Sequence, residues 1–403
     1  MADADFESLF AATTPTRVEP APRSARAGLA LSGGGYRAMI FHCGALRRLY
    51  EVGALARIDR ISSVSGGSIA AAHLALNWDD LMAAGTDTRT YTRLIEEPLL
   101  KFASTNLDVP AGVKGLLLPG RSIAQSVGET YERWFEGATL QDLPDAPRFV
   151  FCATNLGTGS LVRFAKPYTA DRRVGKRDRL DLKLSQVIAA SAAFPPVLSP
   201  MTIELGDSQA LTQQFDGDPR PELADTEYAR RLQLSDGGVY DNLGLQPVEG
   251  HQTVLVSDGG GPFQYESDVA TNWLQHMIRT WKVTDNQVRS LRRSELIDDF
   301  ENKRRNGAFW GISTLHSAYQ AGSIPVDDSW TDRLRAIPTR LAPIGGTTAR
   351  QLVNFSYCLT DAALARYVLD GATVTPAVLP HPDHPISGPA PAGKKKPFWK
   401  FWG

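Results

Sequence analysis

The stretch LALSGGGYRA at residues 29–38 places three consecutive glycines between an apolar, strand-like run and the start of a helical pattern. Glycine has no Cβ, so the backbone N–H groups of Gly33, Gly34 and Gly35 can turn outward and a ligand can approach them closely. A helix start also leaves unpaired N–H donors and a partial positive charge. Apolar residues at positions 39, 43, 46 and 50 then recur at helical spacing. The stretch therefore predicts a strand, a turn that can hold an anion, and a helix.

A second strand–turn–helix unit follows at residues 61–70, which read ISSVSGGSIA. Ser65 stands at the end of the apolar run, and Gly66 and Gly67 permit a sharp turn into the next helix. A serine at such a corner resembles a nucleophile elbow, whose strained turn exposes the Oγ and leaves the next N–H free to bind an oxyanion. Ser63 occupies the position where the G-x-S-x-G pattern begins with glycine. The corner predicts Ser65 as a nucleophile, with Gly66 as a donor.

Bulk composition indicates an ordinary globular protein. The 403 residues are 42% hydrophobic and 22% charged, enough to bury a large core. The net charge of −1, from 43 basic and 44 acidic side chains, gives no overall attraction to nucleic acid. Three scattered cysteines argue against a disulfide framework or a cysteine zinc site and favour a reducing compartment. Without a secretory signal or about 18 consecutive apolar residues, we expect a cytoplasmic protein with no membrane span.

The order of predicted elements indicates the fold class. Apolar, strand-like runs at residues 148–154 and 253–257 alternate with helical patterns. This alternation predicts an α/β fold with a mostly parallel central sheet and helices on both faces. The strand-like run at residues 160–164 is expected to be antiparallel. A long helical stretch at residues 272–302 is expected to pack on the sheet.

We expect one domain with flanking segments. Residues 1–27 lack a core pattern and predict a mobile N-terminal arm. Residues 28–375 form the single α/β domain, with the motifs in residues 28–261 and a helical part in residues 262–375. Residues 376–403 are a Pro-rich tail whose composition is typical of disorder.

Two segments each have two interpretations. The apolar loop at residues 112–120 is either a connection packed in the core or a lip that faces lipid. The tail segment from Lys394 to Trp402 combines lysines with aromatic side chains. It is either a peripheral contact with an anionic membrane surface or a solubilising tail.

A serine nucleophile needs a base, and an aspartate is the best candidate in this chain. None of the seven histidines follows a strand end as the third member of a hydrolase triad does, so we expect structural roles for them. Asp236 ends a strand-like run and precedes Gly237 and Gly238, which leaves its carboxylate at the sheet edge where Ser65 is also expected. Asp258, followed by Gly259 and Gly260, is the rival acid.

Three motifs resemble those of one family when they are taken together. SGGGYRA at residues 32–38, SVSGG at residues 63–67 and SDGGVYDN at residues 235–242 occur in the order found in patatin-like phospholipases. The resemblance covers residues 28–261. It implies a three-layer α/β/α patatin-like fold with a mostly parallel central sheet.

The resemblance also implies the roles of individual residues. Ser65 is the expected nucleophile and Asp236 the second member of a Ser–Asp dyad. The glycines at positions 33 to 35 are the expected oxyanion hole, with Arg37 nearby. Arg37 either holds the phosphate of a lipid substrate or pairs with a carboxylate. The family hydrolyses acyl esters of lipids and needs no metal or other cofactor for this chemistry.

The expected function is therefore a lipid acyl hydrolase of the phospholipase A or lysophospholipase type, which acts on membrane lipids through an acyl-enzyme. An ordinary aspartate, with a pKa near 3.9, is a feeble base, so Asp236 is expected to be desolvated with a raised proton affinity. One alternative is a noncatalytic lipid-binding or scaffolding member of the family. Another is dinucleotide binding, because residues 33–38 fit G-x-G-x-x-A, but the second strand ends in Ser63-Val64-Ser65 without the acidic residue that this function needs.

Overall fold

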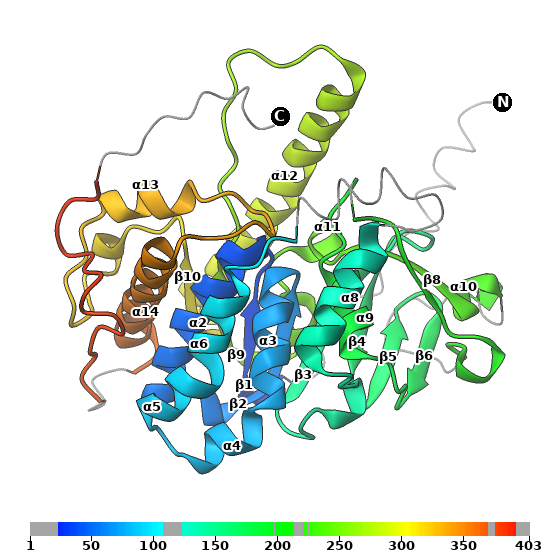
Figure 1. The fold of residues 1–403 in the computed structure, drawn as a ribbon, viewed down its shortest axis with the longest axis horizontal. Helices are drawn as coiled ribbons and strands as arrows, with labels where there is room; N and C mark the ends of the chain where they lie inside the picture. The colour runs from blue at the N-terminus through cyan, green and yellow to red at the C-terminus, as the bar shows by residue number, and fades with distance from the viewer. Residues whose placement is uncertain are drawn as a thin grey trace.

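A central sheet with helices on both faces organises the chain (Figure 1). The structure, a computed structural model, describes residues 23–107, 123–196, 198–212, 221–223, 226–369 and 375–391. In these ranges ten strands form one sheet, in which β10-β9-β1-β2-β3-β4-β5-β6 are neighbours in that order, β8 pairs with β3 and β7 pairs with β8. The strands are β1 Ser24–Leu31, β2 Ile58–Val64, β3 Arg148–Asn155, β4 Ser160–Ala165, β5 Tyr168–Asp171, β6 Gly175–Asp178, β7 Met201–Glu204, β8 Arg231–Asp236, β9 His251–Asp258 and β10 Asn306–Gly311.

Helices fill the connections between these strands. The longer ones are α2 Gly35–Glu51, α3 Gly66–Leu76, α8 Ile123–Phe135, α9 Leu184–Ser191, α12 Trp273–Glu301 and α14 Gly346–Tyr367. The short ones are α4 Trp78–Ala83, α5 Thr88–Tyr91, α6 Glu97–Phe102, α10 Glu227–Arg230, α11 Gly238–Asp241 and α13 Ser329–Arg335. The predicted α/β architecture is thus confirmed.

The sheet combines a parallel part with an antiparallel extension. Strands β10, β9, β1, β2 and β3 pair in parallel, whereas β4, β5, β6, β7 and β8 join through antiparallel pairings. The antiparallel β4 was expected from the sequence. The parallel part carries both glycine-rich turns, at the carboxyl ends of β1 and β2.

Both faces of the sheet are buried, as the apolar strand runs predict. Leu29 and Leu31 belong to the large core under α2, α3, α9 and α14. Ala30, between them, belongs to a smaller core on the other face with Leu243 and Leu296. Side chains alternate between faces along a strand, so β1 contributes to both cores. This burial fixes β1 and the turn that follows it.

Strands β2 and β8 pair with the same edge of β3, one after the other along its length. Val64 at the end of β2 pairs with Cys152, and Asp236 at the end of β8 pairs with the next residue of β3, Ala153. Because β2 is parallel to β3 and β8 is antiparallel to it, the two strands run toward each other and their carboxyl ends meet. The sequence predicted that Asp236 ends a strand, but not this direction of β8.

The boundaries predicted for the N-terminal arm and for the Pro-rich tail differ from those in the structure. β1 already starts at Ser24, whose N–H donates to Gly250 O at 2.7 Å, so the arm predicted for residues 1–27 is wrong for residues 24–27. Residues 375–391, most of which were assigned to the tail, pack on the domain. Ile386 is buried, and the Trp330 indole N–H donates to Gly388 O at 2.8 Å. Hydrogen bonds to the backbone hold this Pro-rich segment without regular secondary structure.

The helix predicted for residues 272–302 is present as α12, but its expected packing is only partly correct. Leu296, near its carboxyl end, is buried, whereas Met277 and Leu291 are exposed. Figure 1 shows the amino-terminal part of α12 projecting beyond the rest of the fold. A helical repeat of apolar residues indicates a helix with an apolar side, and it does not tell what covers that side.

The predictions for the loop at residues 112–120 and for the segment from Lys394 to Trp402 lie outside the described residues. Within the described ranges, no helix combines the length and the apolar character needed to span a bilayer.

We predict that Ile386→Ala lowers the free energy of unfolding by about 2 kcal/mol, because it removes a buried side chain from the contact between residues 375–391 and the domain. Urea unfolding followed by circular dichroism measures this change. Val378→Ala, at an exposed position in the same segment, is the control and is expected to change the value by less than about 0.5 kcal/mol. Equal effects of the two substitutions would contradict the docking of this segment.

Candidate active site

Ser65 stands at a strained corner between β2 and α3. Its φ of 52° and ψ of −120° lie in a region that non-glycine residues rarely adopt. Two glycines after it are required by close packing: a Cβ on Gly66 would lie 2.0 Å from Gly35 O, and a Cβ on Gly67 would lie 2.6 Å from Leu31 O. The turn after β1 and the corner after β2 therefore touch each other through backbone atoms.

A cluster of buried serines supports this corner. The N–H of Ser65 donates to Ser191 Oγ at 3.0 Å, and Ser191 Oγ donates to Cys152 O at 2.7 Å. Ser68 Oγ lies 2.8 Å from Ser191 Oγ and 3.0 Å from Ser63 Oγ. Ser63, where the elbow pattern has glycine, is thus accommodated as a buried, hydrogen-bonded side chain. Hydrogen bonds that satisfy the N–H of Ser65 help to maintain its strained conformation.

The carboxyl group of Asp236 faces this corner. The Ser65 side chain is close enough to this carboxyl to affect its pKa, and Asp236 Oδ1 accepts a hydrogen bond from the N–H of Gly238 at 2.8 Å. The backbone of Asp236 is held by α9, because its N–H donates to Ala193 O at 2.8 Å. Ser65 and Asp236 are only 7% and 4% exposed. The structure therefore brings together the two residues that the sequence singled out.

Burial changes the acid–base behaviour of Asp236. Desolvation and, to a smaller extent, the charge of the nearby Asp285 raise the pKa of Asp236 to about 7, against the lowering effect of the Gly238 N–H and the Ser65 side chain. The prediction that this carboxyl is desolvated with a raised proton affinity is confirmed. Near neutral pH it can both accept and return a proton.

The amides of the glycine turn are not equivalent. The N–H of Gly33 donates to Asn242 O at 3.0 Å, so the expectation that Gly33 supplies an oxyanion donor is wrong in this structure. Within the described ranges, the N–H groups of Gly34, Gly35 and Gly66 have no hydrogen-bond acceptor. Gly34 and Gly35 have φ values of 144° and 60°, which turn these amides at the start of α2.

Gly33 has a packing role instead. A Cβ on Gly33 would lie 2.3 Å from Asn242 Oδ1 and 3.2 Å from Ser65 Cβ, and a Cβ on Gly238 would lie 2.5 Å from the same Asn242 oxygen. The Asn242 side chain therefore lies between the first and third motifs, next to the second. The three motifs meet at one place.

Arg37 is buried and bonded to the protein itself. Its Nε donates to Gly259 O at 3.0 Å, and its Nη1 donates to Arg335 O at 3.2 Å and to Ile337 O. Burial lowers the pKa of Arg37 to about 10, which the charge of Asp258 partly offsets. These contacts favour a structural role near a carboxylate over a role in holding a lipid phosphate.

The rival acid is engaged elsewhere. The carboxylate of Asp258 accepts from Arg289 Nη2 at 3.2 Å and from the N–H of Gly260 at 2.8 Å. The histidines near the glycine units also have structural partners. His42 lies between Ser257 Oγ and Ser32 O, burial lowers its pKa to about 4, and His73 Nε2 bonds to Leu94 O at 2.8 Å.

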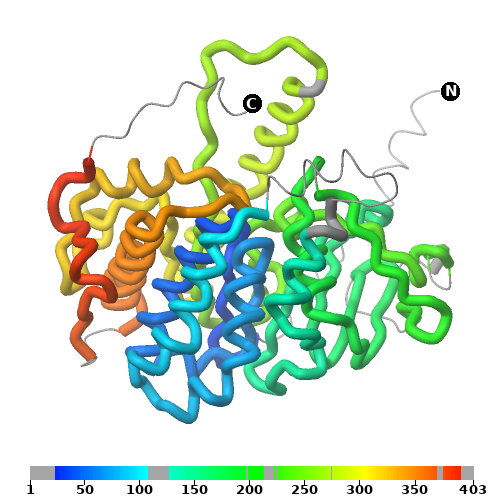
Figure 2. The backbone as a smooth tube through the Cα atoms, viewed as in Figure 1, coloured from blue at the N-terminus to red at the C-terminus, as the bar shows by residue number. Residues whose placement is uncertain are grey.

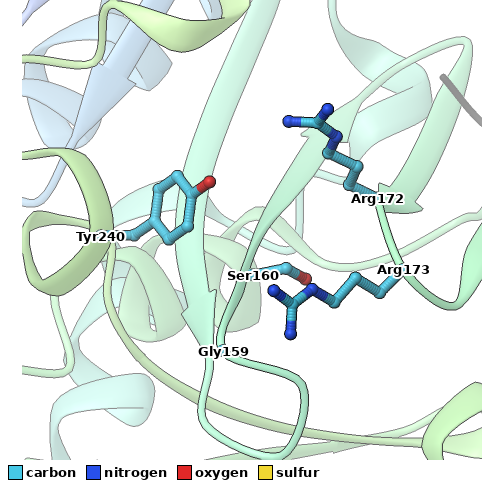
Figure 3. A pocket seen from close by; sticks show the side chains of 5 residues that line it. All are labelled: Gly159, Ser160, Arg172, Arg173 and Tyr240. Atoms are coloured by element: carbon cyan, nitrogen blue, oxygen red, sulfur yellow. The ribbon is translucent and has the colours of Figure 1, made fainter. Parts of the chain in front are cut away.

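A small pocket opens near the start of β4. Figure 3 shows its lining by Tyr240, two arginines, Gly159 and Ser160. Arg172 is exposed, and Arg173 Nη1 donates to Thr158 O at 2.8 Å. None of the predicted site residues lines this pocket. In the described ranges, no group of three or more His, Cys, Asp or Glu side chains is arranged to hold a metal ion.

Fold and site together define an α/β protein with a serine at a strand–helix corner and a buried acid beside it. The sequence matches the model of the patatin-like phospholipase family over residues 29–248, more than half of the chain. The chain therefore belongs to the patatin-like phospholipase family, a family of serine lipid hydrolases.

Solved structures give more distant matches. Human GIVD cytosolic phospholipase A2 is 13% identical over 84% of this chain and 58% of that chain, with a TM-score of 0.49. VipD from Legionella pneumophila is 13% identical over 87% of this chain and 72% of that chain, with a TM-score of 0.37. The chain thus spans less than two thirds of the human protein. No curated protein sequence gives a significant match.

Ser191 belongs to the site, although no motif in the sequence marks it. The N–H of Ser65 bonds to its side chain, and the N–H of Gly237 donates to its carbonyl oxygen at 3.2 Å, so Ser191 connects the corner with the strand that carries the acid. The only local signal is its place at the end of a short helix before Phe194-Pro195-Pro196.

We predict that Ser191→Ala lowers the free energy of unfolding by about 1–3 kcal/mol, because the N–H of Ser65 and Cys152 O lose a buried partner. Chemical denaturation measures this loss. Ser294→Ala, at an exposed position of α12, is the control, with an expected change within about 0.5 kcal/mol. A Ser191→Ala protein as stable as the control would show that this serine does not support the corner.

Proposed function

We propose that the chain hydrolyses carboxylic esters of membrane lipids, as a phospholipase A or lysophospholipase, with Ser65 as nucleophile and Asp236 as base. The observation that carries this proposal is the placement of the Ser65 side chain, at a strained corner, beside the buried carboxyl of Asp236, whose pKa is raised to about 7. Membership of the patatin-like phospholipase family supports the same reaction class.

In the first half of the proposed reaction, Ser65 Oγ attacks the ester carbonyl carbon while its proton passes to the Asp236 carboxylate. The carbonyl oxygen becomes an oxyanion next to the amides of Gly34, Gly35 and Gly66. The tetrahedral intermediate then collapses, the bond to the alcohol oxygen breaks, and Asp236 returns the proton to that oxygen. The products are a free alcohol and an acyl group on Ser65.

In the second half, a water molecule gives a proton to Asp236 and its oxygen attacks the acyl-enzyme. The new intermediate releases Ser65 Oγ, which takes the proton back, and a fatty acid leaves. The same carboxyl thus acts once as base and once as acid in each half, which requires a pKa near the working pH.

Two helix starts support charge stabilisation in this proposal. α2 and α3 begin at Gly35 and Gly66, and both amino-terminal ends carry a partial positive charge. A single preorganised donor to an oxyanion contributes about 2.7–4 kcal/mol in comparable enzymes. The contacts of Arg37 leave lipid-phosphate binding out of this proposal. A noncatalytic lipid-binding role stays the alternative, and the test below distinguishes the two.

We predict that a fluorophosphonate probe labels the protein at Ser65 and fails to label Ser65→Ala. An activated serine at this corner reacts with the phosphorus atom and keeps it covalently bound. Intact-mass and peptide mass spectrometry measure the labelling and its position. An unlabelled wild-type protein that is folded and binds lipid vesicles would instead support the noncatalytic alternative.

The choice of acid is tested in the same assay with hydrolysis of a soluble ester. Asp236→Asn is expected to lower the rate by about 10²-fold or more, because it removes the base. Asp258→Asn is the matched control at the end of β9, the next strand along the sequence, with an expected smaller loss. If only Asp258→Asn abolished activity, the assignment of Asp236 would be wrong.

We predict that kcat/KM rises with pH through about 7, roughly tenfold per unit below that value, because only the deprotonated Asp236 is a base. The stability effect has the opposite sign. A carboxyl with a raised pKa in the folded state binds more protons than in the unfolded state between about pH 4 and 7, so stability falls as pH rises through this window.

Asp236→Asn removes this titration. Its gain in melting temperature over the wild type is therefore expected to be larger at pH 8 than at pH 4.5, as differential scanning fluorimetry can measure. A pH-independent difference between the two proteins would contradict the raised pKa.

A further inference from the structure

Residues 262–285, named the arm here, project from the fold as a loop that leads into the amino-terminal part of α12. Figures 1 and 2 show the loop and the helix rising together beyond the rest of the fold. Residues 262–295 include no buried side chain among those described, and the first buried residue of α12 is Leu296. The arm is therefore surrounded by solvent along most of its length.

The arm exposes large apolar side chains. Tyr265 is 94% exposed and Trp273 is 76% exposed, and Val269, Met277 and Val283 are exposed as well. Positions 273, 277 and 281 fall on one side of α12 at a spacing of four residues, whereas Arg279 and Lys282 fall on the other side. A side of this kind in water indicates a surface that binds an apolar partner.

Specific contacts order the arm. The Arg279 guanidinium lies 4.3 Å from the centre of the Phe263 ring, and its Nη1 donates to Gln264 O at 2.8 Å and to Glu266 Oε1 at 3.2 Å. Asn272 Oδ1 caps the helix by accepting from the N–H of Gln275 at 3.0 Å. The loop is thus fastened to the helix, and the apolar side is presented in a defined orientation.

The base of the arm adjoins the candidate active site. The centre of the Trp281 ring lies 5.2 Å from the centre of the Phe194 ring, in an edge-to-face arrangement. Phe194 follows Ala193, whose carbonyl oxygen holds the backbone of Asp236. Asp285 of the arm is close enough to raise the pKa of Asp236. A molecule bound at the base of the arm would therefore be near Asp236.

We propose that the arm inserts its apolar side into the surface of a lipid bilayer and so places the active site at the membrane. This inference rests on the proposed function, since it concerns the surface from which that site takes its substrate. Trp and Tyr suit the boundary between headgroups and acyl chains, because each combines an apolar ring with a polar group. Amphipathic helices bury their apolar side about 5–10 Å into this boundary.

The charges and the shape of the arm favour an uncharged lipid surface. Residues 262–285 contain two basic side chains, Arg279 and Lys282, against three acidic ones, Glu266, Asp268 and Asp285. No excess of positive charge attracts anionic lipid, so binding is expected to be insensitive to salt. A stable protein–protein interface covers about 800 Å² on each partner. A single row of side chains on a narrow arm suits insertion better than pairing with a second copy.

The test measures binding and hydrolysis separately. Co-sedimentation with vesicles of 1-palmitoyl-2-oleoylphosphatidylcholine is compared for Ser65→Ala, which leaves the vesicles intact, with and without Trp273→Ser/Met277→Ser. The arm substitutions are expected to weaken vesicle binding about tenfold or more, with no dependence on salt. Tyr265→Ser/Val269→Ser tests the loop side of the arm independently. Tyr367→Ser/Val378→Ser is the control, with two exposed apolar residues elsewhere, and is expected to bind like the parent.

In proteins that keep Ser65, the ratio of hydrolysis on these vesicles to hydrolysis of a soluble ester is expected to fall about tenfold with the arm substitutions. Vesicle binding by the arm variants equal to that of the control would overturn the inference, even if both substrates are hydrolysed. A wild-type dimer that the arm substitutions convert to a monomer, without a change in vesicle binding, would overturn it in favour of a second copy. Absence of soluble-ester hydrolysis in the wild type would instead count against the proposed function.

Discussion

The meeting of two strands beside β3 is the constraint on which the site depends. β2 and β8 approach each other from opposite directions and end at neighbouring residues of β3, Cys152 and Ala153. The residue after β2 is Ser65 and the last residue of β8 is Asp236. Neither strand can extend further, because the other occupies its place. The backbone after each strand therefore has to turn out of the sheet there, and the glycines that follow make both turns feasible.

Two features of this arrangement cost free energy, and its hydrogen bonds offset part of that cost. Ser65 holds a backbone conformation that non-glycine residues avoid, and in the described part of the chain no basic side chain is bonded to the buried carboxyl of Asp236. Ser191 binds the N–H of Ser65 through its hydroxyl and the N–H of Gly237 through its carbonyl oxygen. One residue at the end of α9 thus fastens both sides of the meeting point. The pKa of Asp236 stays raised because these hydrogen bonds offset only part of the free-energy cost of desolvating its carboxylate.

The sequence predicted what is decided locally. The glycine turn, the corner at Ser65 and the acid before Gly237 could be recognised because positive φ and close backbone approach require glycine at fixed spacings. What depends on distant residues was missed. The amide of Gly33 is occupied by Asn242, which lies 209 positions later in the sequence, and no local pattern reports this bond. The direction of β8 and the docking of residues 375–391 likewise depend on contacts between residues that are far apart in the sequence. Composition predicted a tail for that segment, although Ile386 is buried and hydrogen bonds to its backbone join it to the domain.

The long helix α12 shows what the spacing of apolar residues cannot predict, namely what covers the apolar side of a helix. Apolar residues at helical spacing require a partner, but a protein core and a lipid surface satisfy the same spacing. In α12 the two cases occur in one helix: Leu296 packs under the sheet, whereas Trp273 and Met277 face solvent. A side chain as large as Trp273 left in water costs free energy unless something covers it when the protein works. Trp281 and Asp285 lie between these two parts, beside Phe194 and Asp236, so the helix passes the candidate active site between its exposed end and its buried end.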